Sequence, residues 1–238
     1  MLANVHDSAA QEWNAANELV SRGIDFLVVL MSSIPDSQWR EAKFPVPVAM
    51  MDRQRELPGF LTVGADFIDG GVKCTQHLIA HGRRQIVPVF GEFTRGDENN
   101  RYTGYLQAVK DASLPAVTPI ICEWNMDGGY QAGIEYLSRG GVDYADGIFC
   151  FSDSIAFGFL RALRENNVHI PEQAALIGFD GIGLGKYAAP ALATLAQPIH
   201  EMVDFIVRIL VAESGAELPS GLQKFPVKLV PAASCGCI

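Results

Sequence analysis

The sequence predicts an α/β fold in which parallel β-sheets are flanked by helices. Three observations lead to this prediction. Short, largely apolar runs alternate with amphipathic stretches along nearly all of the 238 residues. Within most runs the apolarity is continuous, which is typical of strands that are covered by helices on both faces. Repeated strand–helix units then imply parallel sheets joined by right-handed crossovers.

The strands are predicted from short apolar runs. A β-like run at residues 2–5 comes first, and it is followed by runs at 26–30, 46–51, 86–90, 120–122, 148–151 and 174–179. These lengths suit buried strands and are too short for most helices. Several runs end on a polar residue, so the carboxyl end of each predicted strand can be located in the sequence.

The helices are predicted from the amphipathic stretches between the runs. A first helix is expected to begin at Ser8, which forms a capping-box pair with Gln11, and to end at Gly23. Further helices are predicted near residues 66–81, 97–112, 127–139, 153–167 and 199–213. Several of them have an aspartate where an N-cap belongs. No linker rich in glycine, proline or serine interrupts the units, so any division into lobes must come from chain crossings.

Composition and charge exclude several classes of protein. A chain of 25.8 kDa with 49% hydrophobic residues can bury about 70% of its unfolded surface without disulfides or metals. The net charge of −9 argues against nucleic acid or an anionic membrane as the main partner of these residues. No apolar run approaches the ~18 residues of a membrane span, and the first residues lack a secretory signal pattern. We therefore expect a soluble, cytoplasmic protein.

The five cysteines give only a weak signal. Their number is odd, and their spacing matches no zinc motif. Cys235 and Cys237 form a CxC pair that could bind a soft metal, but a structural site needs four ligands and the sequence indicates no others. The sequence therefore predicts no metal site.

Polar side chains follow the predicted strands at their carboxyl ends, where open parallel α/β sheets bind ligands. In chain order, with an arginine in the next helix, these residues are Asp52, Arg101, Trp124, Ser152 and Asp180, and Gln197 adds an amide. Carboxylates accept hydrogen bonds from hydroxyls, a guanidinium donates in a rigid fork, and an indole covers the C–H face of a ring. This mixture suits a neutral polyol such as a sugar.

Each of these positions also has a purely structural interpretation. Asp153 is better explained as a helix cap, and Asp97 can be one too. Asp180 can form a tight turn with the glycine that follows it. Trp124, taken alone, is better explained as a core residue, and Arg101 could pair on the surface with Asp97. Only the shared placement at strand ends favours a binding site.

Catalytic motifs are lacking. The glycine-rich run at residues 181–186 has neither the glycine spacing nor the hydroxyl residue of a phosphate loop. His200 is not followed by the second histidine of a zincin, and no serine or cysteine has a recognisable nucleophile context. The sequence therefore predicts no catalytic residue, no cofactor and no enzyme, although an acid–base pair among the carboxylates stays open.

Several motifs, in chain order, resemble the effector-binding core of LacI/GalR-type bacterial transcription regulators. They lie at residues 46–53, 63–86, 101–105, 151–158, 177–180, 195–198 and 229–237. The likeness covers nearly the whole chain. It implies a type I periplasmic-binding-protein-like fold whose first lobe holds residues 1–63 and 197–223. The second lobe then holds residues 64–196 and 224–238.

The resemblance also implies a set of effector contacts. Transferred position by position, they are Asp52, Arg95, Asp97, Arg101, Trp124, Ser152, Asp180 and Gln197. Trp124 takes the place of the aromatic platform, and Arg95 and Asp97 lie in the family's variable contact loop. The implied partners are a small effector, usually a sugar or nucleoside-type molecule, and a second copy of the chain. DNA is expected to bind only through a domain that these residues do not include.

The sequence departs from the family at its start. Residues 1–5 match the second strand of the sensor core, so the first strand and helix of the N-terminal lobe have no counterpart. Two strands are then expected about 9–10 Å apart with an unpaired gap, at about 1–3 kcal/mol for each unpaired buried group. We expect either a fragment or degraded copy, or strands that close up to repair the sheet.

Three functions are weighed from these observations. The leading interpretation is the effector-sensing module of a sugar-responsive transcription regulator. A solute-binding protein of a transport system would share the fold and chemistry but needs export. An enzyme acting on a sugar or nucleotide is the third, and it lacks a recognisable catalytic motif.

Overall fold

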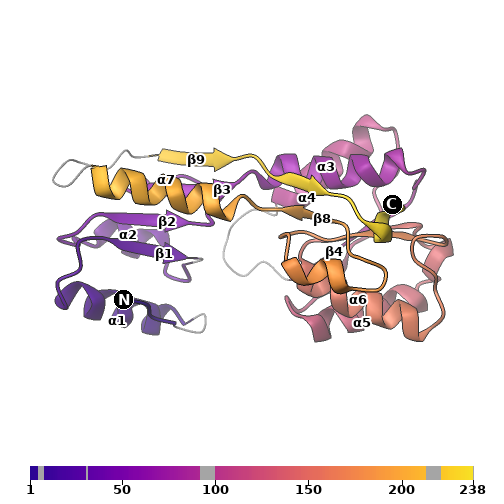
Figure 1. The fold of residues 1–238 in the computed structure, drawn as a ribbon, viewed down its shortest axis with the longest axis horizontal. Coiled ribbons are helices and arrows are strands. Elements are labelled where there is room, and N and C mark those ends of the chain that lie inside the picture. Colours follow the sequence, from indigo (N-terminus) through magenta and orange to yellow (C-terminus); the bar gives the residue numbers. More distant parts are fainter. Residues whose placement is uncertain (5–7, 31, 92–99, 213–220, 238) are drawn as a thin grey trace. The chain divides into compact units, whose positions relative to one another are not determined.

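The structure of the protein is a computed structural model (Figure 1). It describes residues 1–4, 8–30, 32–91, 100–212 and 221–237. The chain forms two compact units. The first contains Met1–Asp66 and Pro198–Pro226, and the second contains Phe67–Gln197 and Val227–Ile238. The chain passes between the units three times, at residues 66–67, 197–198 and 226–227.

The first unit is built on a four-stranded parallel sheet in the order β1-β2-β3-β9. The strands are β1 (Leu27–Leu30), β2 (Val48–Met51), β3 (Leu61–Ala65) and β9 (Gly221–Phe225). Every residue of β2 and β3 is buried. The edge strand β1 buries alternate residues, and Leu30 is 60% exposed. The continuous apolar pattern is thus used fully only by the central strands.

Three helices accompany this sheet, α1 (Ala9–Ser21), α2 (Asp36–Glu41) and α7 (Ile199–Ala212). The start of α1 confirms the predicted cap, because the Ser8 Oγ accepts a hydrogen bond from the Gln11 N–H at 3.4 Å. Trp39 of α2 is completely buried and packs edge-on against Trp13 of α1 and Phe60, with ring centroids 5.9 and 6.2 Å apart. This aromatic cluster fixes both helices in the unit.

Two expectations about the beginning of the chain are wrong for the residues that the structure describes. Met1–Asn4 form no strand, and Leu2 is 94% exposed. The gap expected between residues 2–5 and 26–30 does not arise among the described residues, because Met1–Asn4 add no strand beside β1 and the described neighbour of β1 is β2, from Leu27↔Val48 to Leu30↔Met51. The sheet therefore stays continuous and places the unpaired backbone of β1 at an edge, where solvent can satisfy it.

The second unit contains a four-stranded parallel sheet in the order β5-β4-β6-β7 and a two-stranded antiparallel pair. The strands are β4 (Ile86–Gly91), β5 (Ile120–Cys122), β6 (Gly147–Cys150), β7 (Ala175–Ile177), β8 (Thr194–Ala196) and β10 (Lys228–Val230). All residues of β4, β6 and β7 are buried. Parallel sheets flanked by helices confirm the predicted fold class.

The helices of the second unit pack in pairs. They are α3 (Phe67–Ala80), α4 (Asn100–Asp111), α5 (Met126–Ser138) and α6 (Asp153–Glu165), each inside or within one residue of its predicted range. The pairs are α3 with α4 and α5 with α6, and α5 and α6 lie side by side in Figure 1. A Cβ atom on Gly104 of α4 would lie 2.1 Å from the carbonyl oxygen of Ile68 in α3. Glycine thus allows backbone contact between α3 and α4.

Among the described residues, no helix combines the length and the apolarity that crossing a bilayer requires.

Candidate functional site

The parallel strands of the second unit place three of the predicted contact residues along one edge of the sheet. Trp124 follows β5, Ser152 follows β6 and Asp180 follows β7. Because the carboxyl ends of parallel strands meet at one edge, these side chains begin near each other. The structure brings Asp180 together with Arg101 and Gln197, and we call these three residues the Arg101–Asp180–Gln197 cluster.

Arg101 is held by two aromatic rings. It lies in the first turn of α4, and its Cζ atom is 3.7 Å from the ring centroid of Phe67 and 4.2 Å from that of Phe179. The two rings meet edge to face at 5.4 Å. The arginine side chain is only 12% exposed, and cation–π attraction offsets part of the cost of burying its charge. The faces of the guanidinium are therefore packed, and its N–H edge is the part that can recognise a ligand.

Asp180 lies opposite Arg101 at a backbone position with a positive φ angle. Its Oδ1 atom is 3.7 Å from Nη2 of Arg101 and accepts a hydrogen bond from Nε2 of Gln197 at 2.9 Å. The φ angle of Asp180 is 125°, a region that costs a residue other than glycine about 1–3 kcal/mol. The structure does not bear out the turn interpretation of Asp180, because its backbone forms a parallel bridge with Ala196 and its N–H donates to Leu195 O. Its carboxylate joins the charged cluster.

Gln197 completes the cluster. Its Nε2 is occupied by Asp180, but its buried Oε1 accepts no hydrogen bond from any residue that the structure describes. A buried acceptor without a donor is costly, at about 1–3 kcal/mol. A hydroxyl group from a ligand would satisfy this oxygen.

Trp124 is half exposed, so the core interpretation is wrong. Its exposed fraction is 41%. The indole lies against the backbone at the end of β4, where a Cβ atom on Gly91 would be 2.2 Å from its Cδ1. Gly91 therefore makes room for a flat ring at the same sheet edge that carries Asp180.

Ser152, and not Asp153, caps α6. The N-cap of α6 is Ser152, whose Oγ accepts a hydrogen bond from Ile155 N–H at 3.2 Å. Asp153 is completely buried instead, and it accepts hydrogen bonds from Thr194 Oγ1 at 2.6 Å and Ile182 N–H at 2.7 Å. Burial raises the pKa of Asp153 to about 6, although these hydrogen bonds favour the carboxylate. The cap interpretation of Asp153 is therefore wrong, and the residue is structural for a different reason.

Asp52 belongs to the first unit. It follows β2 with a φ angle of 63°. Its neighbour Arg53 is nearly buried and forms an ion pair with Asp36 at 2.5 Å, and Arg55 adds a second at 3.1 Å. Burial opposes ionisation of Asp36, but the two arginines outweigh it and lower the pKa of that carboxyl. Arg95 and Asp97, the remaining predicted contacts, lie outside the described residues.

Sequence reasoning missed the two aromatic rings that hold Arg101. Phe179 could have been found, because it directly precedes Asp180 at the same strand end. Phe67 gives no such signal, since only the packing of α3 against α4 brings it to Arg101.

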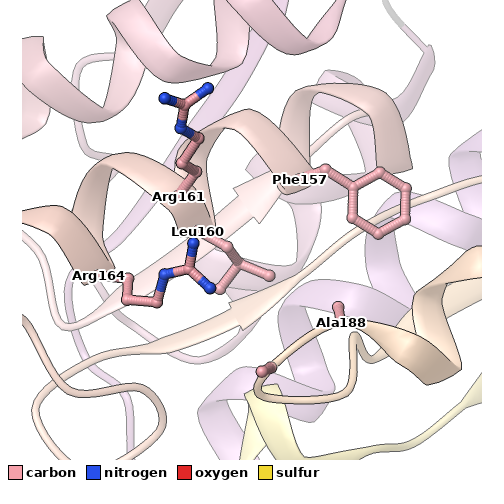
Figure 2. A pocket seen from close by; sticks show the side chains of 6 residues that line it. Phe157, Leu160, Arg161, Arg164 and Ala188 are labelled. Atoms are coloured by element: carbon pink, nitrogen blue, oxygen red, sulfur yellow. The ribbon is translucent and has the colours of Figure 1, made fainter.

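A surface hollow elsewhere on the second unit is unrelated to these residues (Figure 2). It lies between α6 and the loop after Tyr187, and its lining consists of Phe157, Leu160, Arg161, Arg164, Ala188 and Ala189. None of the predicted contact residues lines it. Arg161 there is paired with Glu165 of the same helix at 2.9 Å.

The fold, together with the polar residues at the carboxyl ends of its strands, is that of a small-molecule-binding domain, and a family match in the sequence agrees with this. Residues 75–235 match the periplasmic binding protein-like domain family, and the chain belongs to that family. Its relatives within the family are LacI/GalR-type regulators, which confirms the resemblance seen in the sequence motifs.

Two curated relatives illustrate the relationship. The transcriptional regulator GalR of Salmonella typhimurium is 30% identical over 219 residues, which are 90% of this chain and 63% of GalR. The transcriptional regulator DegA of Bacillus subtilis is 31% identical over 159 residues, which are 66% of this chain and 46% of DegA. The chain thus spans less than two thirds of the length of these relatives, which are named as regulators and not as enzymes.

Two solved structures share the fold. A LacI family transcriptional regulator from Enterococcus faecium with bound ribose is 27% identical, with a TM-score of 0.82 over 93% of this chain and 83% of that one. A periplasmic binding protein/LacI transcriptional regulator from Alkaliphilus metalliredigens, complexed with D-xylulofuranose, is 26% identical. Its TM-score is 0.85 over 98% of this chain and 86% of that one.

Proposed function

We propose that this chain is the effector-binding domain of a LacI/GalR-type transcription regulator and that its effector is a neutral sugar. The observation that carries the proposal is the Arg101–Asp180–Gln197 cluster, in which the Oε1 atom of Gln197 is buried and accepts no hydrogen bond from the described residues. Sugars are bound in two similar solved structures. The relatives named as regulators support the assignment to transcription control.

The chemistry of the cluster favours hydroxyl groups over phosphate. A guanidinium donates hydrogen bonds, a carboxylate accepts them, and an amide does both, so together they can bind adjacent hydroxyls of one ring. The carboxylate of Asp180 would repel a phosphate at this position. Trp124 is the side chain that can cover the apolar face of the ring. Asp52, Ser152, Arg95 and Asp97 are proposed as further contacts on the strength of the family resemblance.

A thermal-shift screen with neutral pentoses, neutral hexoses, sugar phosphates and nucleosides tests the proposal. A sugar at about 100 times its Kd adds about 2.7 kcal/mol to the free energy of unfolding. Arg101→Ala and Asp180→Ala should each abolish this shift and leave the ligand-free protein folded. The matched controls Arg161→Ala and Asp111→Ala, on exposed helix positions of the same unit, should retain it. Stabilisation by sugar phosphates or nucleosides alone would contradict the sugar assignment.

Regulation requires a DNA-binding domain and, in this family, a second copy of the chain. We propose that the domain acts in the bacterial cytoplasm, that effector binding alters the geometry of attached DNA-binding heads, and that the chain does not catalyse a reaction.

We also propose that the chain forms a homodimer. An apolar stripe along α7 supports this, since Ile199, Val203, Val207 and Val211 recur every four residues and are 42–62% exposed. Val207→Asp should then convert a dimer to a monomer in light scattering, whereas Glu201→Ala on the same helix should not. A wild-type chain that is monomeric at every concentration measured would contradict the dimer.

A further inference from the structure

Two of the five histidines and two of the five cysteines of the chain meet in the second unit. His77 lies in α3 and His81 directly follows its last residue, with the two ring centroids 4.5 Å from each other. The C-terminal 3-10 helix, Ala233–Cys235, brings Cys235 and Cys237 to the same face of α3. The Nε2 atom of His77 is 3.1 Å from Cys235 Sγ and 3.7 Å from Cys237 Sγ, and the Nε2 atom of His81 is 3.3 Å from Cys237 Sγ.

We propose that His77, His81, Cys235 and Cys237 form a binding site for one zinc-type metal ion. Zinc favours four tetrahedral ligands, and its usual bond lengths place a nitrogen and a sulfur ligand about 3.6 Å apart. The three nitrogen–sulfur distances of the cluster, from 3.1 to 3.7 Å, lie around this value. The ligand atoms of His77, His81 and Cys237 all lie within 4.8 Å of one another. Cys235, whose Sγ lies 3.1 Å from Nε2 of His77 and donates a hydrogen bond to Ala232 O at 3.1 Å, would supply the fourth ligand by giving up that hydrogen bond.

The segment that carries the two cysteines is fixed in place before any metal binds. Ser234, which directly precedes Cys235, is completely buried. Its hydroxyl donates a hydrogen bond to Leu176 O at 2.7 Å and accepts one from Ala193 N–H at 2.8 Å. Gly236 has a φ angle of 94°, which a glycine adopts without strain. This turn lets both neighbouring cysteines lie near His77 and His81. Metal binding would therefore cost little conformational entropy in this segment.

The chemistry of the four groups also suits a metal of this class. Thiolate and imidazole ligands favour zinc and other borderline or soft ions over magnesium and calcium. His81 is exposed and Cys235 is buried, so an ion can enter from solvent and still be held at depth.

The proposal is tested by metal titration of the full chain under reducing conditions. Zn²⁺, measured by competition with a chromogenic chelator, should bind at one equivalent. Co²⁺ as a spectroscopic substitute should show the thiolate charge-transfer band and the strong d–d bands of a tetrahedral site. His81→Ala and Cys237→Ser should each weaken Zn²⁺ binding about 100-fold, and the double variant should lose the charge-transfer band or shift it to a single thiolate.

Matched controls separate the site from adventitious binding. His200→Ala and Cys122→Ser remove one residue of each kind outside the cluster and should bind Zn²⁺ like the wild type. Circular dichroism of the metal-free variants shows whether they fold. If His81→Ala does not fold, Cys237→Ser still tests the site, because exchanging a thiol for a hydroxyl changes the side chain little in size. An octahedral cobalt spectrum, or a reduced wild type that binds Zn²⁺ no more tightly than His81→Ala and Cys237→Ser, would overturn the proposal.

Discussion

Two aspartates at neighbouring strand ends of the second unit serve different purposes. Asp153 follows β6, is completely buried, and is satisfied by neutral donors from Thr194 and Ile182. Asp180 follows β7, has a side chain that is 28% exposed, and faces the cation of Arg101. Placement at a strand end therefore does not by itself indicate a ligand contact. Exposure and the type of partner distinguish a carboxylate that binds from one that holds the fold.

The largest expected effect is the loss of stability when the buried Asp153 is replaced. Asp153→Ala leaves the Thr194 hydroxyl and the Ile182 N–H without their acceptor, so the free energy of unfolding should fall by about 3 kcal/mol. Urea denaturation measures the change. Asp180→Gly should change stability by no more than about 1 kcal/mol, because glycine removes the cost of the φ angle of 125°. Equal destabilisation by both variants would remove the distinction between the two residues.

The second prediction concerns pH. Burial raises the pKa of Asp153 from 3.8 to about 6, so between these values the folded protein binds a proton that the unfolded chain has already lost. Raising the pH through this window therefore lowers the free energy of unfolding, by about 3 kcal/mol in total. Asp153→Asn removes this contribution. Denaturation at pH 4 to 7 should show the loss in the wild type relative to the variant, and parallel curves would contradict it.

A smaller effect is expected at Gln197. Gln197→Leu removes the buried Oε1 that accepts no hydrogen bond from the described residues, together with the hydrogen bond to Asp180. Sugar affinity should fall about tenfold while stability changes little. Calorimetric titration measures the affinity, and Gln107→Leu on an exposed position of α4 serves as the control. Unchanged affinity would exclude Gln197 from the binding site.

The smallest effect is expected at the aromatic side chain. Gly91→Ala places a methyl group 2.2 Å from the Trp124 ring, so the indole must move and sugar affinity should fall about fivefold. Tryptophan fluorescence reports the displacement directly. Gly183→Ala, whose added methyl group meets no atom within 4 Å, should leave both fluorescence and affinity unchanged. A Gly91→Ala protein with normal affinity would show that Trp124 is not a ligand platform.

The sequence predicts the strongly amphipathic helices and most of the buried strands, but not β3, although every residue of that strand is buried. Amphipathic periodicity predicts α3 to α7, and continuous apolar runs predict β4 and β6. The sequence did not reveal β9 as a strand, because its residues are partly or fully exposed and no apolar run marks it. The three-residue strand β8 is too short to carry a pattern. Residues 2–4, the described part of the first predicted strand, show the opposite error. A short apolar run forms a strand only where a neighbouring strand can pair with it.

The site was predictable only in part, for a related reason. The strand-end rule located Trp124, Ser152 and Asp180, but it could not tell which of Ser152 and Asp153 caps α6, because both residue types are good caps. Contacts that depend on packing were not visible. His77 and Cys237 are 160 positions apart, so the CxC pair near the C-terminus gave no indication that two histidines lie beside it.

The most direct test of the account is calorimetric titration of the wild type and of Asp180→Gly with a panel of neutral pentoses and hexoses. The account predicts that at least one sugar binds the wild type and that none binds Asp180→Gly, whose melting temperature stays close to that of the ligand-free wild type. A sugar that binds both proteins equally well, or a wild type that binds no neutral sugar in the panel, would contradict it.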